Sequence, residues 1–114
     1  MVTSATNFSR SGLRDWIIQR ISAVVLALYL FTILIFFAAN SGLDFQSWRN
    51  FFYNPFMQIF SFLALLSLAA HAWIGVWTIF TDYVKSKGLR LFLEAVMALA
   101  LLAYVAWGFS IIWP

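Results

Sequence analysis

The 32 residues from 50 to 81 contain no Asp, Glu, Lys or Arg. Two further segments, 21–39 and 95–113, are also free of charged side chains. About 20 apolar residues in a helix cross the roughly 30 Å hydrocarbon core of a bilayer. Backbone in lipid must satisfy its own hydrogen bonds, and the period-2 alternation of a membrane barrel is absent. The sequence therefore predicts an all-α integral membrane protein with three transmembrane helices.

Composition supports this class and limits what else the chain contains. Of its 114 residues, 64% are hydrophobic and 10% are charged, whereas soluble domains are about 25% charged. We expect one transmembrane domain over 1–114, with helices at about 14–39, 56–82 and 87–113. Cysteine is absent, which excludes disulfides and Cys-ligated iron–sulfur clusters within the chain. The net charge of +3 forms no basic stripe, so nucleic acid is not an expected partner.

The ends of the helices and the side of the membrane they face follow from a few residues. Asn54-Pro55 marks the start of the second helix, and Ser86 is a candidate N-cap for the third. Cytoplasmic segments carry an excess of Lys and Arg. The connector between the first two helices has only Arg49, so the N-terminus and the second connector are predicted to be cytoplasmic. Their basic residues are Arg10, Arg14, Arg20, Lys85, Lys87 and Arg90.

His71 is the only histidine and lies inside the second apolar segment. An ionisable side chain is costly there, so it marks a candidate functional site as a metal or haem ligand, a proton carrier or a structural hydrogen-bonder. At about 100° per residue, small and polar residues share one arc of this helix with it. Such a stripe suits either close packing of a neighbouring helix or a flat ligand. Its members are Ala64, Ser67, His71, Gly75, Thr78 and Asp82.

If His71 binds a low-spin haem, a second axial ligand is required. The chain has no other histidine and its methionines are poorly placed, so that ligand would come from a partner chain. Arg20, at the end of the first helix, is available to haem propionates, or it is simply a membrane-interface anchor. Tyr83 can donate a hydrogen bond to a quinone carbonyl beside Asp82. The alternative is an interfacial tyrosine next to an acid that pairs with Lys85 or Arg90.

Two motifs resemble a known family. His71-Ala72-Trp73-Ile74-Gly75-Val76-Trp77, followed by Thr81-Asp82-Tyr83-Val84-Lys85, is similar to the signature of the hydrophobic membrane anchor subunit of succinate dehydrogenase. The resemblance is to the smaller anchor of the bacterial type with two anchors and one haem b. Arg20 and the following Ser22-Ala23-Val24-Val25-Leu26 resemble the family's first helix. The similarity covers roughly residues 11–108. Ser86 and Gly88 stand in a connector where relatives can carry proline.

The resemblance implies roles for individual residues. His71 would be an axial ligand of haem b, shared with a larger cytochrome b anchor subunit, and Arg20 would lie near the propionates. Tyr83 would hydrogen-bond ubiquinone, supported by Asp82. Iron–sulfur and flavoprotein subunits would complete a succinate:quinone oxidoreductase (respiratory complex II) in the bacterial cytoplasmic membrane. This chain would hold no complete active site.

Two other classes remain open. One is a cofactor-free structural anchor, in which His71 only makes a hydrogen bond. The other is a small helical transporter subunit, which would need a carboxylate in the centre of a helix. Asp82 and Glu94 both lie near a helix end.

Overall fold

The computed structural model describes residues 12–114, so Arg10 lies outside the described residues. This part of the chain contains four α-helices and no strand. They are α2 (Leu13–Ala39), α3 (Phe45–Phe52), α4 (Pro55–Tyr83) and α5 (Lys87–Ile112). Helices α2, α4 and α5 are long and apolar enough to cross a membrane, which confirms the predicted all-α class with three spanning helices.

The two helix starts read from the sequence are confirmed. The Asn54 side chain accepts a hydrogen bond from the Phe56 amide at 3.0 Å, and Pro55 occupies the first turn of α4. The Ser86 hydroxyl accepts one from the Leu89 amide at 3.3 Å at the start of α5. Each side chain satisfies an amide that the first turn of a helix leaves without a backbone partner.

The short helix α3 was not predicted. Its first turn is capped by Asp44, whose carboxylate accepts a hydrogen bond from the Ser47 amide at 2.8 Å. Trp48 packs edge-on against Phe37 of α2, and Phe51 stacks on Phe36 with 3.8 Å between ring centroids. These contacts hold α3 against the end of α2.

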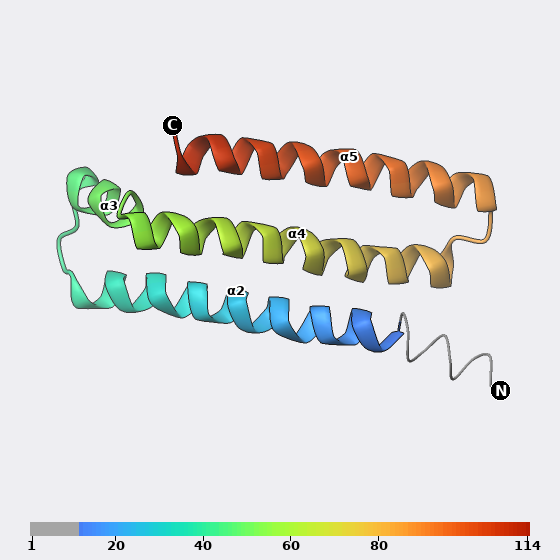
Figure 1. Cartoon of the computed structure of the whole chain (residues 1–114), viewed down its shortest axis with the longest axis horizontal. Coiled ribbons are helices and arrows are strands. Elements are labelled where there is room, and N and C mark those ends of the chain that lie inside the picture. Colours follow the sequence, from blue (N-terminus) through green and yellow to red (C-terminus); the bar gives the residue numbers. More distant parts are fainter. Residues whose placement is uncertain (1–11) are drawn as a thin grey trace.

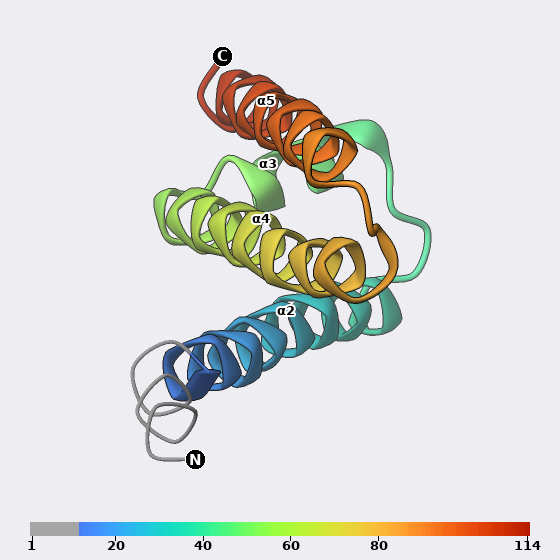
Figure 2. The same cartoon turned by 90° about the vertical axis from the view of Figure 1, so that its right-hand side faces the viewer.

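Helix α4 lies between α2 and α5 and runs antiparallel to both (Figure 1). Figure 2 shows the same order from the end of the bundle, with α3 closing the far end. The described residues extend over 57 × 28 × 21 Å. With a rise of 1.5 Å per residue, the 29 residues of α4 span about 43 Å, more than the hydrocarbon core requires.

Different contacts join α4 to its two neighbours. Toward α5, Gly108 allows close approach, because a Cβ there would lie 2.6 Å from Leu65 Cδ2. The Gln58 amide also donates to the Ile112 carbonyl at 2.9 Å. Toward α2, the contacts include hydrogen bonds between side chains, one of which joins the hydroxyls of Tyr29 and Ser61 at 2.6 Å.

Most of the apolar surface faces outward. Among the described residues only Ser22, Met57, Ala64 and Glu94 are buried, while Ile35 and Leu99 are 66% and 68% exposed. A water-soluble domain buries such side chains in a core, whereas lipid or a partner helix covers them in a membrane protein.

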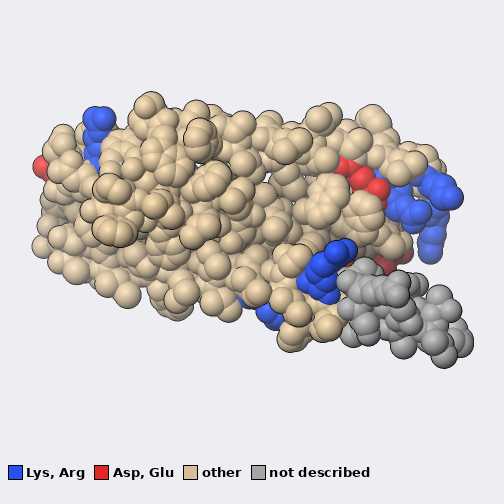
Figure 3. Space-filling view, viewed as in Figure 1, with Lys and Arg blue, Asp and Glu red and all other residues tan. Residues whose placement is uncertain are grey.

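Charged side chains gather at the two ends of the bundle. In Figure 3 most Lys and Arg side chains lie at the end where α2 and α5 begin and α4 ends, which we call the basic end. It comprises Arg14, Lys85, Lys87 and Arg90, whereas Arg20 lies about two turns into α2. Arg49 of α3 lies at the opposite end. The cytoplasmic location of the basic end stays a prediction.

Candidate functional site

His71 sits on the face of α4 that packs against α2. Its Nδ1 lies 3.0 Å from the hydroxyl oxygen of Ser22, a buried residue of α2. Within residues 12–114 its Nε2 has no hydrogen-bond partner, and the ring is half-buried. His71 therefore hydrogen-bonds a neighbouring helix, which the sequence left open as an alternative to a ligand role, and one ring nitrogen has no hydrogen-bond partner among these residues.

The stripe of small and polar residues is a packing surface toward α2 over part of its length. Ala64 is 5% exposed. A Cβ added at Gly75 would meet only the Gln19 side-chain nitrogen, at 3.9 Å, which is ordinary van der Waals contact. The Gln19 Oε1 atom is buried and has no hydrogen-bond partner among the described residues. Thr78 and Asp82, nearer the helix end, are exposed.

Arg20 lies close to His71 in depth but on another face of α2. It lies two positions before Ser22, which corresponds to about 3 Å along the axis and about 200° around it. Its side chain is exposed, and the guanidinium carbon lies 5.2 Å from the Trp16 ring centroid. Within this chain Arg20 is therefore not brought next to His71.

Asp82 and Tyr83 end α4 and are both exposed, with Tyr83 at 77%. No ion pair joins Asp82 to Lys85, Arg90 or any other of the residues described. A carboxylate at a helix C-terminus faces the negative end of the helix dipole. The pair thus presents a phenol and an unpaired acid at the basic end, about 18 Å along the helix from His71.

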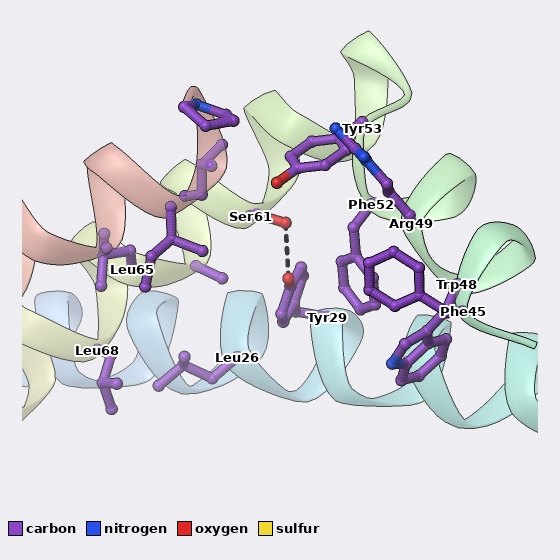
Figure 4. A pocket seen from close by; sticks show the side chains of 15 residues that line it. Leu26, Tyr29, Phe45, Trp48, Arg49, Phe52, Tyr53, Ser61, Leu65 and Leu68 are labelled. Carbon is purple, nitrogen blue, oxygen red and sulfur yellow. Dashed lines mark hydrogen bonds between the residues drawn. The ribbon is translucent and has the colours of Figure 1, made fainter.

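A cleft of about 790 Å³ lies at the opposite end of the bundle, between α2, α3, α4 and α5 (Figure 4). Aromatic side chains of α3 form one wall, and among the described residues that line the cleft Arg49 carries the one positive charge. The Tyr29–Ser61 hydrogen bond crosses its inner part. Another hollow, of about 940 Å³, is lined by Trp73 and Trp77 on a different face of α4.

The four site residues predicted from the sequence lie outside both hollows. Across residues 12–114, no three His, Cys, Asp or Glu side chains cluster as a metal site.

Comparison with known proteins decides the family. Residues 4–107 match the model of the succinate dehydrogenase/fumarate reductase transmembrane subunit. The chain belongs to this family. It is 40% identical over 105 residues to the succinate dehydrogenase hydrophobic membrane anchor subunit of Coxiella burnetii, covering 92% of this chain and 91% of the relative. The protein of the same name from Rickettsia bellii is 29% identical, covering 89% and 82%.

Membership of the succinate dehydrogenase/fumarate reductase family fixes the coarse role. The chain is a membrane anchor subunit, and it works in a complex with other subunits. Its three spanning helices and its bacterial relatives make it a multi-pass protein of the inner membrane.

Sequence reasoning missed two features of this anchor subunit. The resemblance includes Ser22 in the first helix, but it does not identify Ser22 as the partner of His71. The available signal was a hydroxyl in an otherwise apolar stretch, 21–28. Glu94 is 8% exposed on α5, and its burial could not be read from its position near a helix end.

Proposed function

We propose that this chain is the smaller anchor of a succinate:quinone oxidoreductase. In this proposal His71 supplies one axial ligand to a haem b shared with a larger cytochrome b anchor subunit. Asp82 and Tyr83 supply part of a ubiquinone-reduction site. The observation that carries the proposal is the ring of His71: the chain's one imidazole is held through Nδ1 and has no partner at Nε2 within residues 12–114.

The surroundings of His71 fit a bound macrocycle. Haem iron takes an imidazole nitrogen as an axial ligand, and a ligating imidazole is normally held by a hydrogen bond at its other nitrogen. Gly75, one turn away, adds no side chain to this face of α4. Packing within this chain does not require a glycine there, since a Cβ would make no contact closer than 3.9 Å. When bound, haem b supplies one-electron redox chemistry. This chain contributes the ligand, its orientation and an apolar setting.

Arg20 stays a candidate for the propionates on the family resemblance and on its depth. Among residues 12–114 the Arg20 guanidinium lies over the Trp16 ring and makes no hydrogen bond or ion pair, so its N–H groups can donate to a propionate. Because it lies on another face of α2 from Ser22, we expect it to contribute less to haem binding than His71.

Asp82 and Tyr83 suit one side of a quinone pocket. The Tyr83 hydroxyl can donate a hydrogen bond to a quinone carbonyl, and the Asp82 carboxylate can accept from neighbouring donors. Reduction of a quinone to a quinol takes up two electrons and two protons. Tyr83 would bind and orient the acceptor at the basic end, where water can deliver the protons. The remaining walls would come from partner subunits.

The family assigns the other steps to the partners. A flavoprotein subunit would oxidise succinate, and an iron–sulfur subunit docked on the basic end would carry electrons to the quinone. The larger anchor would cover the exposed apolar faces of this chain and supply the second histidine.

Purification from bacterial membranes through a tag on this chain tests the proposal. We expect three further subunits to co-purify, a reduced-minus-oxidised spectrum of a b-type haem, and succinate-dependent reduction of ubiquinone. A complex with succinate oxidation but no haem spectrum would favour the cofactor-free anchor. Purification of this chain without a succinate-oxidising partner would overturn the proposal.

A further inference from the structure

Ser22 makes two hydrogen bonds at the contact between α2 and α4. Its hydroxyl donates to the carbonyl of Gln19, one turn earlier in α2, at 3.1 Å. The same oxygen lies 3.0 Å from Nδ1 of His71, and Ser22 is only 4% exposed. No other side chain among the described residues joins α2 to the imidazole by a hydrogen bond.

The single hydrogen of the Ser22 hydroxyl cannot be donated in both contacts. A serine hydroxyl has a single hydrogen, and a carbonyl oxygen can only accept. If the hydrogen points to the Gln19 carbonyl, the contact with His71 is satisfied only when Nδ1 carries a proton and donates to Ser22. A neutral imidazole then has its lone pair on Nε2.

From this geometry we infer that Ser22 is the positioning residue of His71, selecting the Nδ1–H tautomer and fixing the ring so that Nε2 is presented to the haem iron. The inference rests on the proposed function, since it concerns the same histidine. It adds a residue from a different helix, and it makes the packing of α2 on α4 part of the cofactor site.

The hydrogen bond also changes the electronic character of the ligand. A donor N–H held by an acceptor makes the opposite nitrogen more basic, and such outer partners typically affect metal affinity by roughly 10- to 100-fold. A more basic axial ligand favours the oxidised iron. Loss of the Ser22 hydroxyl should therefore raise the midpoint potential of the haem and weaken its retention.

Thr32 offers a matched control on the same helix. Its hydroxyl donates to the Leu28 carbonyl at 2.8 Å, but Thr32 is only half-buried and makes no hydrogen bond to α4. Thr32→Ala therefore removes a hydroxyl that bonds only the backbone of α2. Ser22→Thr and Ser22→Val form a second matched pair, because these two side chains differ by a hydroxyl in place of a methyl.

The experiment compares the purified complexes by redox titration of the haem, by electron paramagnetic resonance of the oxidised haem, and by haem content after dilution in detergent. We expect Ser22→Ala and Ser22→Val to raise the midpoint potential, change the low-spin signal and speed haem loss roughly 10-fold or more. Ser22→Thr and Thr32→Ala should match the parent complex.

The Ser22 variants test the role of Ser22, and His71→Leu tests the ligand assignment separately. Equal potentials and signals in the parent, Ser22→Ala and Ser22→Val complexes would overturn the role of Ser22, even if His71→Leu abolishes the haem spectrum. A normal haem spectrum in His71→Leu would overturn the ligand assignment and the role of Ser22 with it. If Ser22→Ala does not assemble, the difference between the Thr and Val complexes decides the question.

Discussion

A histidine inside a membrane helix has to satisfy two ring nitrogens without bulk water. His71 meets half of this requirement through the Ser22 hydroxyl, 3.0 Å from Nδ1. An unsatisfied polar group in hydrocarbon costs several kcal/mol, so a second partner for Nε2 is physically favoured. Haem iron, with a ligand from another subunit, is the partner proposed here.

Tyr83 gives a prediction that separates quinone chemistry from overall stability. Tyr83→Phe keeps the ring and removes the hydroxyl that would bind the quinone carbonyl. We expect kcat/KM for ubiquinone reduction to fall roughly 2- to 10-fold, the loss of about one hydrogen bond. Succinate oxidation with an artificial acceptor should be unchanged.

Tyr104→Phe is the control for this measurement, since Tyr104 is 60% exposed on α5 and has no hydrogen bond to other described residues. Equal losses in both assays for Tyr83→Phe would indicate general destabilisation and count against the quinone role.

The site was only partly readable from single residues. His71 is predictable as a site residue because it is the one imidazole in a charge-free stretch. Asp82 and Tyr83 are predictable because they follow His71 at the spacing of the family's motif. The Ser22 contact depends on how α2 is rotated against α4, which an apolar sequence with one weak polar signal does not define. Arg20 shows a similar limit: the sequence predicts it at the end of the first helix, whereas the structure places it near the depth of His71 and on another face of α2 from Ser22.

At the scale of helices, two side-chain pairs join α2 to α4, one at His71 and one nearer α3. In the second, the Tyr29 and Ser61 hydroxyls lie 2.6 Å apart (Figure 4). The Tyr29 ring also packs edge-on against Phe60, with 5.1 Å between ring centroids. Hydrogen bonds between membrane helices are individually modest, so the rotational setting of α2 depends on both pairs together.

Tyr29→Phe should lower stability modestly. The substitution removes the hydroxyl and keeps the ring against Phe60, so we expect a loss of about 0.5–1.5 kcal/mol. Thermal unfolding of the purified complex measures it, with Tyr104→Phe as the control. Equal losses of stability in the Tyr29→Phe and Tyr104→Phe complexes would mean that the Tyr29–Ser61 contact adds nothing beyond the loss of any tyrosine hydroxyl.

The cap of α3 should make that helix sensitive to acid. Hydrogen bonds from the backbone and then the side chain of Ser47 hold the pKa of the exposed Asp44 carboxyl below its ordinary value of 3.8. A lowered folded-state pKa means that the ionised group stabilises α3 above pH 3.8. This contribution is lost as the pH falls through the lowered value.

Hydrogen exchange of the amides of α3 tests this dependence. Protection should fall in acid for the parent protein, whereas Asp44→Asn, which still caps but does not titrate, should show little change. The same acid dependence in Asp44→Asn would exclude the carboxylate as the cause.

The elements differed in how well the sequence defined them. The three long helices follow from charge-free length, because lipid leaves the backbone no other stable form. Helix α3 has only eight residues and includes Arg49, so no spanning rule identifies it. Its signals were Asp44 at the N-cap and apolar side chains at Phe45, Trp48 and Phe52, about one turn apart.

The whole molecule is an open row of helices rather than a closed bundle. Helix α4 is central and α2 and α5 expose most of their apolar side chains (Figures 1 and 2). Such a shape suits a chain that supplies half of a shared cofactor site, because partner helices can cover the exposed apolar faces of α2 and α5.

The orientation of the molecule can be tested without interference from native thiols, because the chain has no cysteine. Gln46→Cys on α3 and Lys87→Cys at the start of α5 place single thiols at opposite ends. The positive-inside rule predicts that a membrane-impermeant maleimide labels Gln46→Cys in spheroplasts. Lys87→Cys should react only after the membrane is dissolved in denaturing detergent. The reverse pattern would invert the proposed topology.

We propose above that His71 binds the iron of haem b. A reduced-minus-oxidised absorption spectrum of the His71→Leu complex is the most direct test of this ligation. The complex is purified beside its parent, and its subunits are quantified to verify assembly. We expect the six-coordinate b-type spectrum to be lost in an assembled complex. An unchanged spectrum at full haem content would contradict it.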